Sequence, residues 1–234
     1  MSLWQFMKWI WRGKSARRAF LNIEVSNRVA LQGLVLDIGG KGQPSYREVL
    51  QDSDKATWVV IDISPSKEVS VLGDLTSMPL KEDTFNAVIR FNVLEHVYNY
   101  HAALGEIGRV LKINGVLYGY VPFLINVHPD PSDYWRFTGD CLNRCLSEAG
   151  FSVDCIIPHC GVFISCFDLV SFVANKIPPI HFLLAALFLL ADSLLSCIRP
   201  SLAQRFPVGY FFIGRKSCET SERHISFGST LDKG

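Results

Sequence analysis

The sequence lacks any Cys-x-x-Cys pair, and its seven cysteines are an odd number. Both features argue against a disulfide framework and against a zinc site built on paired cysteines. We therefore expect reduced thiols in a cytosolic protein and no metal centre. An excess of charge of one sign is also lacking. The formal net charge is +1, which gives no general case for a nucleic-acid partner. With 49% hydrophobic residues, 234 residues suffice for one domain with a filled core.

The first twenty residues contain no acid, but they hold three of the five tryptophans and five basic residues. Here the charges follow the apolar residues, the reverse of a signal peptide, so cleavage is not expected. Trp4, Met7 and Trp11 would share one face of a helix. We predict a basic and aromatic helical segment over residues 1–30. It either lies in an anionic membrane interface or packs on the domain through its tryptophans.

Short apolar runs alternate with helical stretches along most of the chain. The predicted strands cover 34–38, 58–63, 69–74, 85–91, 116–123, 151–157 and, far downstream, 208–215. Helices are predicted over 99–112 and 138–149, and one more between the first two strands. Near-continuous apolar strands separated by helices indicate a parallel sheet covered on both faces. We predict one α/β domain over 31–215, with a doubly wound, mostly parallel seven-stranded sheet.

An apolar stretch, 161–206, stands between the last two predicted strands. Pro178-Pro179 divides it, and residues 181–198 come close to the length and apolarity of a membrane span. A single crossing would separate the strand 208–215 from its sheet. The stretch is therefore predicted as a helical insertion that dips into a membrane, folds over the active site or covers a sheet edge. Residues 216–234 are polar and are predicted to be a disordered tail.

Glycines and polar residues stand where predicted strands end, which is where parallel sheets bind nucleotide-like cofactors. These positions are Asp37, Gly39, Gly40, Gly42, Asp62, Asp74 and Asn92. A carboxylate at Asp62 can accept hydrogen bonds from both hydroxyls of a ribose, and Asp74 can meet an adenine amino group. Two positions have structural alternatives: Asp37 could hold the turn by accepting backbone N–H groups, and Asp74 could cap a helix.

Taken in order, these segments resemble the class I S-adenosylmethionine (SAM)-dependent methyltransferases, of the branch that contains quinone-biosynthesis and glycan-cluster enzymes. The segments are Asp37–Gly40, Val60–Asp62, Gly73–Leu75, Asp83–Val88, Asn92–Val97 and Leu111–Leu117. The resemblance covers 34 to about 157 and the last strand, and it implies a Rossmann-like fold. It also implies that SAM is the cofactor, bound by Asp37, Gly39, Gly40, Gly42, Asp62, Ile63, Asp74, Leu75 and Asn92.

The glycine motif departs from the family pattern, because Lys41 and Gln43 stand where glycines are usual. The sequence resembles a variant found among glycan-cluster methyltransferases. A nicotinamide-binding unit is the rival, but its Gly-x-Gly-x-x-Gly pattern is absent, since Pro44 and Ser45 stand where the third glycine would fall.

The segment 128–138 is the densest polar and aromatic cluster of the chain, and in the family the loop at this place lines the acceptor pocket. Its predicted acceptor-binding residues are Asp130, Asp133, Tyr134 and Arg136. Methyl transfer is an in-line displacement, so alignment and exclusion of water dominate. A base helps when the acceptor is an alcohol, and we predict His128 for that role, with His96 second. The structural alternative is a turn at Asp130-Pro131 with Tyr134-Trp135 packed on the sheet.

These patterns favour a SAM-dependent methyltransferase acting on a hydroxyl, or another nucleophile, of a small molecule or lipid-linked glycan. We expect it in the cytoplasm, possibly peripheral at the inner face of a membrane, which it contacts through 1–20 and 161–206. Lys41 and Gln43 motivate an alternative, a non-catalytic SAM-fold scaffold or binding protein at a membrane surface. A nucleic-acid methyltransferase is disfavoured, because a basic stripe and an Asn-Pro-Pro-Tyr type of motif are absent. A protein substrate stays open.

Overall fold

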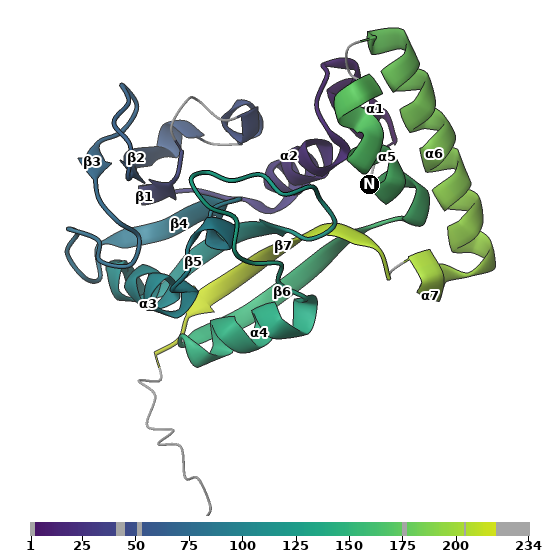
Figure 1. Cartoon of the computed structure of the whole chain (residues 1–234). Helices are drawn as coiled ribbons and strands as arrows, with labels where there is room; N and C mark the ends of the chain where they lie inside the picture. Colours follow the sequence, from purple (N-terminus) through teal and green to yellow (C-terminus); the bar gives the residue numbers. More distant parts are fainter. Residues whose placement is uncertain (1–2, 41–44, 51–52, 175–176, 204, 219–234) are drawn as a thin grey trace, which may run out of the picture.

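The computed structural model describes residues 3–40, 45–50, 53–174, 177–203 and 205–218 (Figure 1). Its strands are β1 (Gly33–Ile38), β2 (Ala56–Asp62), β3 (Val71–Leu72), β4 (Phe85–Phe91), β5 (Leu111–Pro122), β6 (Phe151–Cys160) and β7 (Pro207–Lys216). They form one sheet in the order β3-β2-β1-β4-β5-β7-β6. The strands β1 to β5 pair in parallel, and β7 runs antiparallel between β5 and β6. The predicted mostly parallel seven-stranded sheet is confirmed.

The helices have polar side chains at several of their N-termini. They are α1 (Leu3–Trp11), α2 (Ala16–Arg28), α3 (Tyr100–Val110), α4 (Gly139–Glu148), α5 (Val162–Ala174), α6 (Pro178–Ile198) and α7 (Pro200–Ala203), with short 3₁₀ turns η1 (Ser45–Val49), η2 (Ser53–Lys55) and η3 (Leu94–His96). Ser15 accepts from a backbone N–H in the first turn of α2, Asn99 does so in α3 and Thr138 in α4. These caps satisfy donors that have no partner inside the helix.

Helices cover both faces of the sheet, as expected for a doubly wound domain (Figure 1). Along β1, Leu36 faces the cluster that includes α3 and α4, whereas the neighbouring Val35 faces α2. The same alternation holds in β4, where Val88 and Ile89 face opposite ways. This period of two follows from strand geometry, and it explains why these strands are apolar throughout.

The predicted helical insertion before the last strand is confirmed as α5, α6 and α7, between β6 and β7. Together with α1 it forms a separate hydrophobic cluster, and Figure 1 shows α1, α5 and α6 side by side beyond one end of the sheet. The buried face of α6 carries His181, Ala185, Leu189 and Asp192. The Asp192 carboxylate accepts the first backbone N–H groups of α5, which explains an acid within this apolar helix.

The N-terminal segment packs on the domain, and of its three tryptophans Trp9 is buried. Phe6, Met7 and Ile10 are buried, whereas Trp4 and Trp11 are exposed. The expected shared face of Trp4, Met7 and Trp11 is therefore split: Met7 packs on the domain and the two tryptophans remain at the surface.

Several predicted boundaries differ from the structure. The helix over 99–112 ends at Val110, because Leu111 is buried and pairs with Phe85 at the start of β5. The third strand is shorter than 69–74, and the strand over 151–157 continues to Cys160. Between β1 and β2 the described residues form only the 3₁₀ turns η1 and η2, not the expected helix. Most of the predicted tail, 219–234, lies outside the described residues, whereas Lys216 belongs to β7.

Candidate functional site

A cavity of about 360 Å³ opens at the carboxyl ends of β1, β2 and β4. Ligands of open parallel sheets bind at such an edge, where the strand order reverses. Nine of the residues predicted from the sequence line it. They are Gly39, Asp62, Ile63, Asp74, Leu75, Asn92, His96, Asp130 and Tyr134.

Two carboxylates on the cavity wall also shape the turns that carry them. Asp62 is buried, and its Oδ1 accepts a hydrogen bond of 2.8 Å from the Ser64 backbone N–H. Asp74 accepts from both the backbone N–H and the hydroxyl of Thr76, at 2.7 and 2.8 Å. The structural alternative for Asp74 was a helix cap, but here it caps a turn that ends at Ser77.

The backbone adopts positive φ angles at Gly39, just after β1, and at Asn92, just after β4. Gly39 has φ +74°, and a Cβ added there would lie 2.7 Å from Cγ2 of Val93. Asn92 has φ +54°, which is uncommon for a residue with a side chain. Such conformations persist where the surrounding structure imposes them, often at ligand sites. Here the Asn92 N–H donates to the Tyr120 carbonyl across the sheet.

Asp37 does not line the cavity, although the sequence predicted a contact with the cofactor. Its fully buried carboxylate accepts a 2.7 Å hydrogen bond from the Tyr46 hydroxyl and a 2.6 Å bond from Arg47. Burial raises the pKa of this carboxyl, and the two donors oppose that rise. Asp37 therefore ties β1 to η1 through side chains, where the alternative had been backbone N–H groups. Gly40 lies against this carboxylate and is also absent from the wall, and Gly42 lies outside the described residues.

The residues predicted to bind the acceptor, in the loop 128–138, line two different hollows. Asp130 and Tyr134 line the first cavity. Asp133 and Arg136 line a second, more open hollow of about 360 Å³, and Tyr134 belongs to both. Arg136 donates to both carboxylate oxygens of Asp133, at 2.5 and 2.6 Å, and holds the pKa of that carboxyl well below its usual range. Because these two charges neutralise each other, they shape the loop more than they attract an ion.

Aromatic rings stand at the rim where the two hollows meet. Tyr98 is exposed, and its ring centre lies 5.4 Å from that of Tyr134. Trp135 donates its Nε1–H to the Val97 carbonyl at 3.1 Å and packs against the core. The packing alternative for Tyr134-Trp135 therefore applies to Trp135, while Tyr134 is half exposed at the rim.

The two candidate bases lie next to each other, but His96 lines the cavity and His128 does not. Their ring centres are 5.0 Å apart, and both Nε2 atoms face Oε1 of Glu95, at 3.8 Å from His96 and 3.9 Å from His128. The Glu95 side chain is fully buried, and neither of its oxygens has a hydrogen-bond partner in the described part of the chain. Burial raises the pKa of Glu95 to about 7.

Sequence reasoning gave Glu95 no role, although it stands in the motif Asn92–Val97. A second missed residue is Arg90 of β4, which is wholly buried and makes no hydrogen bond among the described residues. Burial lowers its pKa to about 10, and it interacts electrostatically with Glu95. In the sequence, Arg90 is one residue of an apolar strand, with no motif that marks it. Its electrostatic interaction with Glu95 becomes visible only in the folded chain.

Part of the site, up to Asn99, lies in a segment that matches a known protein family. Residues 36–119 match the family described as a methyltransferase domain. An uncharacterized protein of Methanocaldococcus jannaschii is 47% identical over 91 residues, which are 36% of this chain and 38% of that protein. The chain thus matches well under half of this curated relative's length.

Solved structures share the fold at low sequence identity. The [4+2]-cyclase SpnF is 21% identical with a TM-score of 0.57, over 87% of this chain and 83% of that chain. The phosphoethanolamine N-methyltransferase 2 of Haemonchus contortus, in complex with SAM, is 13% identical with a TM-score of 0.55, over 91% and 56%. The 1,6-didemethyltoxoflavin-N1-methyltransferase of Burkholderia thailandensis, with S-adenosylhomocysteine bound, is 13% identical with a TM-score of 0.52, over 87% and 80%.

Proposed function

We propose that the chain is a SAM-dependent methyltransferase that transfers a methyl group from SAM to a hydroxyl of a small molecule or lipid-linked glycan; the match of residues 36–119 to a methyltransferase domain and the strand order of the sheet support this. One observation carries the choice of acceptor: Tyr134 belongs both to the cavity beside Asp62 and to the apolar hollow that reaches α5. The fold alone does not decide the reaction, since one structural neighbour is a cyclase.

The residues of the cavity fit the cofactor. Asp62 at the end of β2 offers a buried carboxylate for ribose hydroxyls, and Asp74 stands one turn beyond β3 for the adenine amino group. Ile63 is 61% exposed beside Asp62 and presents an apolar surface on which a base can rest. A Cβ at Gly39 would fill space against Val93, so the missing side chain keeps the approach to the backbone open.

When bound, SAM supplies a methyl group on a sulfonium, which an oxygen nucleophile can take. The residues of this chain have to align the acceptor and keep water away, because the displacement is in line. Tyr98 and Tyr134 cover the rim from two loops, and Asn92 is held in place by its backbone bond to Tyr120. Nε2 of His96, on the cavity wall and 3.8 Å from Glu95, takes the proton that the acceptor hydroxyl loses as the O–CH₃ bond forms and the S–CH₃ bond breaks.

The second hollow suits an acceptor with an apolar tail. Its lining is mostly apolar: Phe123, Leu124, Ile125, Val127 and, from α5, Leu169, together with Tyr134, Asp133 and Arg136. Leu169 is 44% exposed and Val127 is 76% exposed, so their burial by a lipid chain would be favourable. An acceptor whose head lies near Tyr134 could place its tail along this surface toward the insertion.

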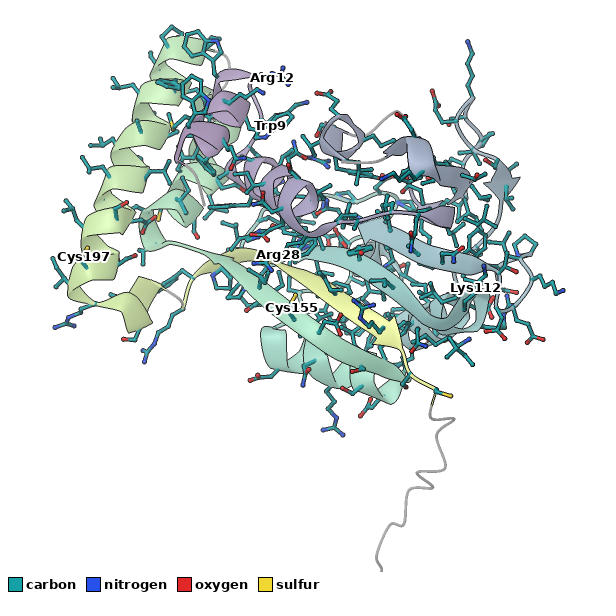
Figure 2. The ribbon with its side chains drawn as sticks, turned by 180° about the vertical axis from the view of Figure 1, so that it is seen from behind. Trp9, Arg12, Arg28, Lys112, Cys155 and Cys197 are labelled. Atoms are coloured by element: carbon teal, nitrogen blue, oxygen red, sulfur yellow. The ribbon has the colours of Figure 1, made fainter. Side chains whose placement is uncertain are left out.

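The outer face of α6 is the proposed contact with a membrane surface. One stripe of exposed apolar residues follows helical spacing along it: Ile180, Leu183, Leu187, Leu190, Leu194 and Ile198. Figure 2 shows α6 at the edge of the molecule with side chains directed outward. By length and composition this one described helix could cross a membrane. However, its opposite face packs on α1 and α5, so we propose that it lies on the surface instead.

Basic residues near the exposed tryptophans of α1 favour an anionic membrane as the partner. Lys8 is exposed on α1, and Arg12 follows that helix beside the ring of Trp9. A bacterial or eukaryotic inner leaflet carries such anionic lipids, which fits the expected cytoplasmic location at the inner face of a membrane. No nucleic-acid partner is proposed.

Calorimetric titration with SAM and S-adenosylhomocysteine tests the cofactor. We expect micromolar binding, about −8 kcal/mol. Folded protein that binds neither ligand would contradict the proposal and leave the alternative, a non-catalytic scaffold at a membrane surface. Incubation with methyl-labelled SAM then tests the acceptor. Label transferred to an organic-soluble, lipid-linked sugar supports a lipid-borne substrate, whereas label found only on water-soluble compounds contradicts it.

Liposome flotation tests the membrane contact. The intact chain should float with vesicles that contain phosphatidylglycerol and less with phosphatidylcholine alone. Leu187→Ser and Leu190→Ser together should reduce flotation, because both side chains are exposed and no packing is lost. Ile113→Ser, an exposed apolar residue on the far side of the domain in β5, is the matched control. Equal flotation of both variants would rule out α6 as the contact.

A further inference from the structure

The cluster of Glu95, His96 and His128 turns two imidazole Nε2 atoms toward one buried carboxylate, and no hydrogen bond among the described residues joins the three groups. One possible ligand atom from each lies within 4.8 Å of the others. The Glu95 carboxylate is 0% exposed, and neither oxygen has a partner among the described residues. A buried carboxylate without a donor is costly, so the arrangement calls for a positive centre.

The proton positions follow from the other side of each ring. Nδ1 of His96 lies 2.6 Å from the Ser132 carbonyl oxygen, which can only accept, so this nitrogen carries the proton. Nδ1 of His128 lies 3.3 Å from both the Asn126 carbonyl and the Asp133 carboxylate, which also only accept. In the neutral form of each ring, Nε2 then carries the lone pair, on the side that faces Glu95.

We infer that Glu95, His96 and His128 form a site for a divalent transition-metal ion, bound by one carboxylate oxygen and two imidazole Nε2 atoms. Two histidines and one carboxylate are a common ligand set for such ions, and imidazole favours them over Mg²⁺ and Ca²⁺. The Nδ1 hydrogen bonds to the Ser132 and Asn126 carbonyls, with the Asp133 carboxylate also 3.3 Å from Nδ1 of His128, are outer contacts of the kind that orient metal-binding histidines.

The spacing agrees with one ion between the three groups. Metal bonds of about 2.0–2.2 Å place neighbouring ligand atoms roughly 3–3.5 Å apart. The Glu95 oxygen lies 3.8 and 3.9 Å from the two Nε2 atoms, so each pair has to close by less than about 1 Å. A single shared proton would instead join one pair at about 3 Å. The two nearly equal separations favour an ion over a proton.

Electrostatics limit which ion fits. Arg90 interacts electrostatically with Glu95 and offsets part of its charge, while the charges of Asp133 and Arg136 cancel each other. The site is thus less negative than an acidic cluster, and neutral imidazole nitrogens supply most of its bonds. An ion there would stand at the edge of the cofactor cavity, because His96 lines it. With an ion bound, Nε2 of His96 would be a metal ligand, and the ion would take over from this base the task of lowering the pKa of an acceptor hydroxyl.

Cobalt titration tests this site without SAM or an acceptor. Chain without a histidine tag is treated with chelator and titrated with Co²⁺, followed by visible absorption and calorimetry. One Co²⁺ per chain with d–d bands is expected. Glu95→Gln and His128→Asn should each weaken binding by about tenfold or more. His101→Asn removes an exposed histidine of α3 and should leave binding unchanged.

Two outcomes would overturn the inference: no Co²⁺ bound by folded wild-type chain, or wild-type affinity in His128→Asn. His128 is one-third exposed, so this variant should fold even if Glu95→Gln does not, and circular dichroism checks both. Asp62→Asn separates this inference from the proposed function. That variant should lose SAM affinity while still binding Co²⁺.

Discussion

The Asp62→Asn substitution tests the cofactor site with little change of shape. Oδ1 of Asp62 holds the Ser64 backbone N–H at 2.8 Å, and the asparagine oxygen can keep that bond. The other oxygen becomes an NH₂ group, which cannot accept from a ribose hydroxyl. The substitution therefore removes the negative charge and the acceptor that face the cavity while it preserves the turn from Asp62 to Ser64.

The expected loss follows from hydrogen bonds to a charged group, about 1.5–3 kcal/mol each. Two ribose hydroxyls give about 3–6 kcal/mol, or roughly a hundredfold to ten-thousandfold weaker binding of SAM and S-adenosylhomocysteine. Calorimetry measures both ligands, and thermal unfolding without ligand checks that the fold is intact. Asp54→Asn, at an exposed acid of η2, is the control. A dissociation constant for Asp62→Asn within threefold of wild type would refute the assignment of Asp62.

Three further substitutions test the backbone and the insertion. Asp192→Ala should lower the free energy of unfolding by about 2–4 kcal/mol in urea, because two N–H groups of α5 lose their acceptor; an unchanged midpoint would contradict this. Gly39→Ala should cost about 2–4 kcal/mol and weaken SAM binding, because φ is positive and Val93 is close, whereas Gly105→Ala on exposed α3 should not destabilise. Burial lowers the pKa of His159 in the folded state. The stabilisation that its neutral ring contributes is therefore complete above about pH 6.5 and is lost as the pH falls through the lower folded-state pKa. His159→Phe should therefore gain stability relative to wild type between about pH 7 and 5, measured by urea unfolding at each pH; a constant difference would count against a buried neutral ring.

The sheet could be predicted because its strands are buried on both faces and read as apolar runs. The boundaries of α3 and β5 could not, since apolar residues continue from Val110 into Leu111 without a break. Only the pairing of Leu111 with Phe85 marks the change from helix to strand. That pairing joins residues 26 positions apart, which helical spacing within one segment does not reveal.

The site residues that directly follow predicted strands could be identified from the sequence. Asp62 and Asp74 follow their strands in the sequence, and parallel pairing brings such ends to one edge. Asp37 has the same sequence signature but points to Tyr46 and Arg47, because successive side chains of a strand face opposite ways. The grouping of Glu95 with His128 was out of reach, since it depends on how the loop 128–138 folds back over η3.

Two buried acids of the insertion, Asp168 and Asp192, hold its helices to each other and to the rest of the domain. Asp168 of α5 is buried and accepts from the backbone and side chain of Arg17 in α2, at 3.1 and 2.6 Å. Arg17 is 25% exposed, so removing one partner of this half-buried pair should cost about 1–3 kcal/mol, less than for a fully buried pair. Asp192 of α6 holds α5 through hydrogen bonds, because its carboxylate accepts from the Phe163 and Ile164 backbone N–H groups. A hairpin that left the domain to enter a bilayer would break the pair with Arg17 and expose the cluster around Phe167. We therefore propose that the insertion would meet lipid as a fixed part of the domain, through the outer stripe of α6, with Leu169 left beside the loop 128–138.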